Sequence, residues 1–121
     1  MAKKILVVDD TPMYLAQIKQ ILMTSGHEIE TAASGKEALE KARTIHPDII
    51  FIDVVMPEMD GFAACRELTK DCTTQRIPIV FVSSKNTQAD LVWAELQGAK
   101  AYITKPYTPA QILEQVDAFL G

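Results

Sequence analysis

Five short apolar segments recur along the chain, and amphipathic segments lie between them. Three are continuously apolar, at residues 5–8, 49–52 and 79–82. Strands that are buried on both faces of a sheet have such sequences, because neither face contacts water. Weaker segments at residues 28–33 and 101–103 complete the set of five. This alternation constrains the fold more than any other feature of the sequence.

The intervening segments show the apolar spacing of amphipathic helices. Their stripes are formed by Leu15, Ile18 and Leu22, by Ala38, Leu39, Ala42 and Ile45, by Phe62, Cys65 and Leu68, by Leu91, Val92 and Leu96, and by Ile112, Val116, Phe119 and Leu120. Ser34 is a predicted N-cap of the second helix. Thr108 and Pro109 predict the start of the last helix, because proline is favoured at the first helical position.

Strands that alternate with helices predict a doubly wound α/β fold, with five parallel strands and five helices on both faces. A chain of 121 residues is the common size of one domain, so we expect residues 1–121 to form a single domain. Functional groups in such sheets lie at the carboxyl ends of the strands, near the point where the strand order reverses.

Composition excludes several classes of function. The net charge is −4 and the basic residues are scattered, which disfavours direct nucleic-acid binding. No apolar run approaches the roughly 20 residues that span a bilayer, so we expect no membrane insertion. The chain shows no signal peptide, and Cys65 and Cys72 have no metal-binding spacing. We therefore expect a cytoplasmic protein with reduced thiols.

Polar residues follow four of the apolar runs. Asp9 and Asp10 follow the first, Asp53 the third, Ser83 the fourth and Lys105 the fifth. A single aspartate after a strand is commonly only a turn or capping residue. Side chains of these types at four strand ends are harder to explain in that way.

These residues suit phosphoryl transfer. Three carboxylates repel one another unless they are neutralised, and hard oxygen ligands suit Mg²⁺. A carboxylate such as Asp53 can attack phosphorus to give an aspartyl phosphate. The three equatorial oxygens of the transferring group then need stabilisation, which Mg²⁺, the Lys105 ammonium and the Ser83 hydroxyl can supply.

Over its whole length the sequence resembles the CheY-like receiver domains of two-component response regulators. The resemblance rests on motifs in a fixed order: Asp9-Asp10, Asp53 with Met56-Pro57 and Asp60-Gly61, Ser83, and Lys105-Pro106. It implies a flavodoxin-like or CheY-like strand order of 2-1-3-4-5. It also implies a phosphoprotein that receives its phosphoryl group from a histidine kinase and signals to a downstream protein target.

The resemblance assigns the metal site and the acceptor. Asp53 would be the phosphoacceptor and a metal ligand. Asp10 would bind Mg²⁺ directly, Asp9 partly through water, and Val55 through its backbone carbonyl. Ser83 and Lys105 would contact the phosphoryl group.

The resemblance also implies a switch. As Ser83 moves toward the phosphoryl group, Tyr102 would turn inward into the vacated space, although an ordinary half-buried strand tyrosine is the alternative. The bond between Lys105 and Pro106 is a candidate cis peptide. Valine at Val55 and lysine at Lys85 cannot accept a hydrogen bond from an attacking water, which predicts that self-dephosphorylation is slow or depends on a partner phosphatase.

The stretch from Asp90 to Ala99 resembles receivers of type IV pilus (twitching-motility) chemotaxis-like systems. The usual partner surface of the family is the face of the fourth helix, fifth strand and fifth helix, where Trp93, Tyr102 and Tyr107 are the expected contacts. Trp93 could equally be an ordinary helix anchor. We expect a monomer, with dimerisation on phosphorylation as a second state.

The expected function is therefore a single-domain response regulator without an output domain. A phosphate sink and a fragment of a longer regulator fit the same sequence. An aspartyl-phosphate phosphatase is disfavoured, since such enzymes usually have Asp-x-Asp after the first strand, whereas this chain has Asp9-Asp10. A flavodoxin-like electron carrier is disfavoured because these acids would repel a flavin phosphate. A receiver that is never phosphorylated is least favoured, and beyond slow self-phosphorylation and self-dephosphorylation we expect no enzyme activity.

Overall fold

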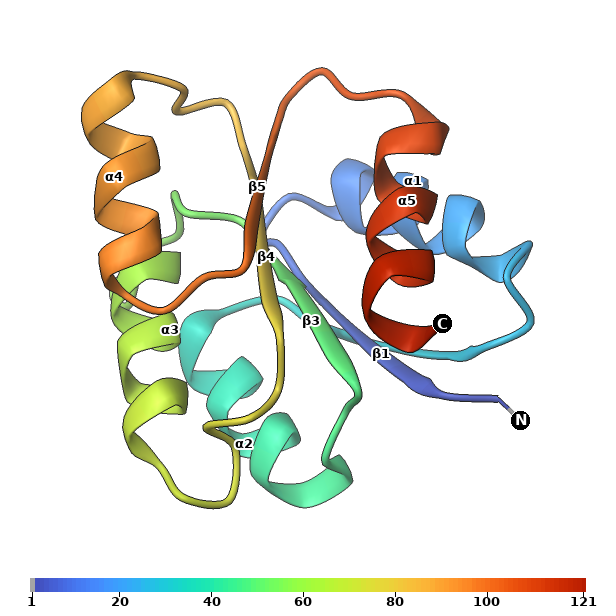
Figure 1. Ribbon diagram of the computed structural model, residues 1–121, viewed down its shortest axis with the longest axis horizontal. Helices are drawn as coiled ribbons and strands as arrows, with labels where there is room; N and C mark the ends of the chain where they lie inside the picture. The colour runs from blue at the N-terminus through green and yellow to red at the C-terminus, as the bar shows by residue number, and fades with distance from the viewer. Residues whose placement is uncertain (1) are drawn as a thin grey trace.

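A parallel sheet runs through the middle of the molecule, and helices cover both of its faces (Figure 1). The computed structural model describes residues 2–121. Its elements, in chain order, are β1 (Lys4–Val8), α1 (Pro12–Met23), β2 (Glu28–Ala32), α2 (Gly35–Ile45), β3 (Ile49–Ile52), α3 (Gly61–Lys70), β4 (Ile79–Ser83), α4 (Gln88–Leu96), β5 (Ala101–Thr104) and α5 (Pro109–Leu120). The strict alternation of strands and helices confirms the predicted fold class.

The strand order is β2-β1-β3-β4-β5, as predicted, and all four pairings are parallel. Chain order reverses at β1, which lies between β2 and β3. Val8 pairs with Ile52, and Ile52 pairs with Phe81. The carboxyl ends of β1, β3 and β4 therefore meet at one edge of the sheet.

Two apolar cores lie on opposite faces of the sheet. Leu6 and Val8 pack with α2, α3 and one residue of α4, whereas Ile5 and Val7 pack with α1 and α5. The alternation arises because successive side chains of a strand point to opposite faces. Every residue of β3 and β4 is buried, which explains their continuously apolar or nearly apolar sequences.

The predicted helix starts are confirmed. The Ser34 hydroxyl accepts a hydrogen bond from the backbone N–H of Glu37 at 3.1 Å, and Thr108 caps α5 with Pro109 in its first turn. None of the helices among residues 2–121 is long and apolar enough to cross a membrane.

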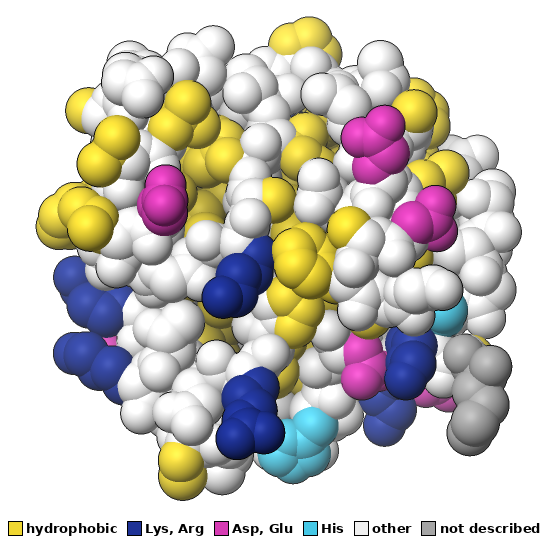
Figure 2. Space-filling view, in the orientation of Figure 1, with side chains coloured by type: hydrophobic (Ala, Val, Ile, Leu, Met, Phe, Trp, Pro, Cys, Tyr) yellow, Lys and Arg dark blue, Asp and Glu magenta, His cyan; other side chains and the backbone are white. Residues whose placement is uncertain are grey.

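The apolar stripe predicted for α4 is wrong in part. Val92 is 48% exposed and Leu96 is 69% exposed, while Ala94 is the buried residue of this helix. The reason is the position of α4, which packs over β5 at the edge of the sheet and has little of the sheet beneath it. Figure 2 shows hydrophobic side chains at the surface in this region.

Candidate functional site

Three carboxylates gather where β1 and β3 end. The backbone N–H of Asp9 donates to Ala32 at 3.1 Å, and that of Asp53 donates to Val8 at 3.0 Å, so both residues continue the hydrogen bonding of the sheet. Oxygens of Asp9, Asp10 and Asp53 lie within 4.8 Å of one another. Asp9 and Asp53 are buried, whereas Asp10 is exposed. The site is therefore open to solvent at Asp10.

Lys105 supplies the cation of this site. Its ammonium lies 2.8 Å from Asp9 Oδ2 and 3.3 Å from Asp53 Oδ2, and its side chain is only 6% exposed. Its backbone N–H donates to the Ser83 carbonyl at 2.9 Å, which fixes the segment after β5 against β4. The peptide bond between Lys105 and Pro106 is cis, as predicted.

Burial raises the pKa of Asp53 above its usual value, and the neighbouring Asp9 carboxylate raises it further. The Lys105 ammonium opposes both effects and lowers this pKa, without cancelling them. The negative charge on Asp53 is thus incompletely compensated by the protein. A bound cation would stabilise that charge.

The donor set fits Mg²⁺. Carboxylate oxygens from three aspartates, one of them exposed to water, match a hard cation that keeps several water ligands. Asp9, Asp10 and Asp53 are the residues that would hold it. The Val55 side chain is 55% exposed, and its backbone N–H donates to Asp53 Oδ1 at 3.4 Å. Val55 is therefore adjacent to the Asp53 carboxylate.

Ser83 is the last residue of β4 and is fully buried. Its hydroxyl accepts a hydrogen bond from the backbone N–H of Lys85 at 3.3 Å, and it contributes to lowering the pKa of Asp53. The Lys85 ammonium lies 3.8 Å from Asp90, the residue that completes the capping box of α4. The β4–α4 loop is thus tied to both the site and the start of α4.

The segment between β3 and α3 requires glycine at one position. The Gly61 N–H donates to the Val54 carbonyl at 2.8 Å, and Asp60 caps α3 through the N–H of Ala63. A β-carbon on Gly61 would lie 2.2 Å from the backbone oxygen of Asp53. This close approach explains the Asp60-Gly61 pair, because a larger residue would displace the backbone at Asp53.

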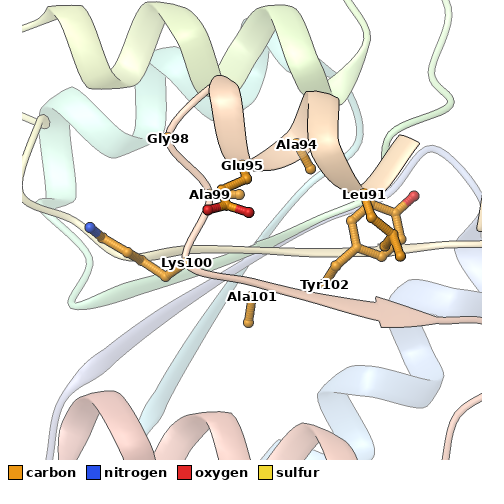
Figure 3. Close-up of a pocket in the computed structure, with 8 residues that line it drawn as sticks. All are labelled: Leu91, Ala94, Glu95, Gly98, Ala99, Lys100, Ala101 and Tyr102. Atoms are coloured by element: carbon orange, nitrogen blue, oxygen red, sulfur yellow. The ribbon is translucent and has the colours of Figure 1, made fainter. Parts of the chain in front are cut away.

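Tyr102 connects β5 to the β4–α4 loop. Its hydroxyl donates to the backbone carbonyl of Lys85, and its ring centroid lies 5.9 Å from that of Phe81. Tyr102 also lines a groove between α4 and β5 with Leu91 and Ala99 (Figure 3). The hydroxyl therefore has a protein partner, in contrast to the alternative of an ordinary tyrosine with its hydroxyl in water.

The three aromatics predicted for the partner surface are not all brought together. Trp93 is 46% exposed on α4, and Tyr102 packs with the core on that side of the sheet. Tyr107 instead packs with the core of α1 and α5, where its hydroxyl donates to Gln17 Oε1 at 2.7 Å. Tyr107 therefore contacts α1 rather than α4.

One contact of the site was not predicted. The ring of Tyr14, on α1, lies 3.6 Å from the Lys105 ammonium, measured to the ring centroid. The only signal in the sequence is the proximity of Tyr14 to the Asp9-Asp10 pair at the start of a helix. Its partner is far away along the chain, and no periodicity links the two.

The sheet, the three acids and the buried lysine define a doubly wound α/β domain with an acidic site at the carboxyl ends of its strands. The family model for the response regulator receiver domain matches residues 5–117, and the chain belongs to this family.

Among curated relatives, protein PilH of Pseudomonas aeruginosa is 38% identical over 118 residues, which cover 98% of each chain. The PhoP transcriptional regulatory protein of Bacillus subtilis is also 38% identical, over 120 residues that cover 99% of this chain. The chain spans only 49% of PhoP, so relatives include longer proteins.

Solved structures agree with the fold. The chemotaxis protein CheY4 of Vibrio cholerae has a TM-score of 0.92 at 29% identity, with 98% of this chain and 99% of that chain covered. The receiver domain of sensor histidine kinase PA1611 from Pseudomonas aeruginosa has a TM-score of 0.92 at 26% identity, and the match covers 100% of this chain and 99% of that one. That structure has a magnesium ion coordinated in its active site cleft.

Proposed function

We propose that this protein is a Mg²⁺-dependent phosphorylation switch of a two-component system, in which Asp53 accepts a phosphoryl group from a histidine kinase. The observation that carries the proposal is the placement of Lys105, whose ammonium lies 3.3 Å from Asp53 and is buried beside it. A buried cation beside one carboxylate of a three-acid cluster suits phosphoryl transfer, because it can stabilise the charge of the transferred group.

The transfer needs no proton from Asp53. A carboxylate oxygen of Asp53 forms a bond to phosphorus as the bond from phosphorus to the donor's imidazole nitrogen breaks, and that nitrogen keeps the electron pair. Lys105 and Ser83 would each stabilise one phosphoryl oxygen. Mg²⁺ held by Asp9, Asp10, Asp53 and the Val55 carbonyl would supply charge neutralisation at this site.

The output is proposed to be a protein contact. The groove between α4 and β5, with Tyr102 on its wall and Trp93 exposed on α4, is the surface connected to the site through the β4–α4 loop. The resemblance of residues 90–99 to receivers of type IV pilus chemotaxis-like systems favours a role in pilus control. We propose a cytoplasmic location, since the donor kinases of such systems act there, and a monomer that dimerises when it is phosphorylated.

Phosphorylation is tested by mass spectrometry after incubation with acetyl phosphate and Mg²⁺. The wild-type protein should gain the mass of one phosphoryl group, and Asp53→Asn should gain none. Asp117→Asn, which alters an exposed aspartate on α5, is the matched control and should behave as wild type. Modification that persists in Asp53→Asn would place the acceptor elsewhere.

The pathway is tested by phosphotransfer from purified histidine kinases of the source organism. A kinase of a chemotaxis-like pilus system should transfer to this protein faster than the other kinases do. Equal or faster transfer from an unrelated kinase would argue against the pilus assignment while leaving the phosphoacceptor function intact.

A further inference from the structure

We propose that Tyr14 is a positioning residue for phosphoryl transfer, and that its ring holds the Lys105 ammonium in the direction of Asp53. This inference rests on the proposed function, because it concerns the rate at which Asp53 is phosphorylated. It assigns to Tyr14 a role in the rate of transfer that depends on its ring, while its hydroxyl takes no part in the reaction.

The Lys105 ammonium is enclosed on several sides. Asp9 Oδ2 lies 2.8 Å away, Asp53 Oδ2 lies 3.3 Å away, and the Tyr14 ring centroid lies 3.6 Å away. The face of an aromatic ring carries partial negative charge and attracts a cation. Because the lysine side chain is only 6% exposed, water competes little for this contact. The ring therefore occupies a side of the ammonium that would otherwise be free.

A lysine side chain needs such support. Its four-carbon stem is flexible, and ordering it costs conformational entropy. The two carboxylates attract the ammonium but do not hold it midway between them. It lies closer to Asp9 than to Asp53. A ring packed against the ammonium limits its movement away from both acids.

Helix α1 is suited to provide a fixed platform. Ile18, one turn after Tyr14, is 2% exposed and packs in the apolar core between the sheet and helices α1 and α5. Gln17, on the same helix, accepts a hydrogen bond from the Tyr107 hydroxyl at 2.7 Å. Helix α1 thus contacts the segment after β5 twice, at Lys105 through Tyr14 and at Tyr107 through Gln17.

Loss of the ring should slow phosphorylation without weakening metal binding. Tyr14→Leu leaves an apolar residue but no ring, and we expect the bimolecular rate constant with acetyl phosphate to fall by about 3- to 30-fold, the range of a partly to fully desolvated cation–π contact. Tyr14→Phe keeps the ring and should remain close to wild type. The dissociation constant of Mg²⁺ should be unchanged in both variants. Met13→Leu, a neighbouring exposed residue of α1, is the control for the helix.

A double-mutant cycle separates positioning from a general structural effect. In a Lys105→Met background the ammonium is absent, so Tyr14→Leu should cause no further loss of rate. Equal losses in both backgrounds, a wild-type rate for Tyr14→Leu, or a Tyr14→Phe variant as slow as Tyr14→Leu would each overturn the proposal. If Tyr14→Leu does not fold, Tyr14→Met serves as the second variant without a ring.

The contact itself is tested by NMR on the metal-free protein. The methylene protons of Lys105 next to the ammonium should be shifted upfield by the Tyr14 ring, with the shift kept in Tyr14→Phe and lost in Tyr14→Leu. An unchanged shift in Tyr14→Leu would overturn the contact. If wild-type protein accepts no phosphoryl group while the ring shift is present, the proposed function fails and the contact between Tyr14 and Lys105 stands.

Discussion

A β-carbon placed on Gly61 would lie 2.2 Å from the backbone oxygen of Asp53. Because the obstacle is backbone rather than a flexible side chain, the substitution Gly61→Ala must shift either the start of α3 or the backbone of Asp53. We expect a loss of about 1–3 kcal/mol in the free energy of unfolding, measured with urea, together with slower phosphorylation. Gly26→Ala is the control: no atom lies within 4 Å of its β-carbon, although its φ of +80° still carries a conformational cost. A fully active Gly61→Ala variant would contradict the close approach.

Asp53→Asn should be more stable than wild type in the absence of metal. Burial and the neighbouring Asp9 raise the pKa of Asp53 in the folded chain, so the charged carboxylate destabilises the fold at neutral pH. A group with a raised pKa contributes stability below its unfolded pKa and loses that contribution as the pH rises. The advantage of Asp53→Asn should therefore be present at pH 7 and shrink as the pH falls toward about 4.

Urea unfolding in EDTA measures this difference, with Asp117→Asn as control. Added Mg²⁺ should stabilise the wild type more than Asp53→Asn, since it binds the folded chain through Asp53. Equal stability of the two proteins in EDTA at every pH would contradict the electrostatic account.

Alkaline pH should destabilise the fold through buried groups that resist ionisation. Burial raises the pKa of the Cys65 thiol from 9.0 to about 12, and burial, with Asp9 and Tyr14 nearby, raises that of Tyr107 from 10.0 to about 12. Both groups ionise first in the unfolded chain, so their contribution to stability should be constant below about pH 9 and should fall above it. Unfolding midpoints from pH 7 to pH 11 should fall less steeply in Cys65→Ala. An equal slope would exclude Cys65 as a contributor.

Helix α4 should exchange its amide hydrogens faster than the other helices do. Ala94 is the buried residue of its nine, whereas α3 buries five of ten residues. Local opening is least costly where little apolar surface is packed. Hydrogen exchange followed by mass spectrometry or NMR checks this order. If the amides of α4 were protected as well as those of α3, α4 would have to be stabilised by further contacts.

The phosphoryl group should be hydrolysed slowly by the isolated protein. The Val55 side chain is exposed beside Asp53 and has no polar group to orient a water molecule. The Lys85 ammonium lies 3.8 Å from Asp90 and cannot accept a hydrogen bond from a water molecule. Decay of the phosphorylated form is measured after removal of acetyl phosphate. Val55→Gln, which adds an amide, should shorten the lifetime, and decay of the wild type within seconds would contradict the prediction.

Much of this architecture was predictable from the sequence. The run at residues 49–52 coincides with β3, since strands buried on both faces must be apolar throughout. Ser34 and Thr108 were identifiable as caps because hydroxyl capping is a local interaction. The acids and Lys105 were placed correctly at strand ends, because the topology brings those ends to one edge.

What the sequence could not predict depends on tertiary position. Val92 and Leu96 have helical spacing, but α4 lies at an edge strand, so the apolar stripe remains largely exposed. The contact between Tyr14 and Lys105 depends on how two side chains from different elements are directed. Tyr107 was expected on the same surface as Trp93, but its hydroxyl donates to Gln17 of α1.

The backbone N–H groups of Asp9 and Asp53 extend the hydrogen bonding of β1 and β3 beyond the last strand residues. The backbone of Asp53 is therefore held by the hydrogen bonding of the sheet. The β4–α4 loop, in contrast, is held to Tyr102 and to Ser83 by single hydrogen bonds at Lys85, which can be exchanged. If Asp53 is phosphorylated as we propose, the added group would displace this loop, while the backbone of Asp53 would stay in place.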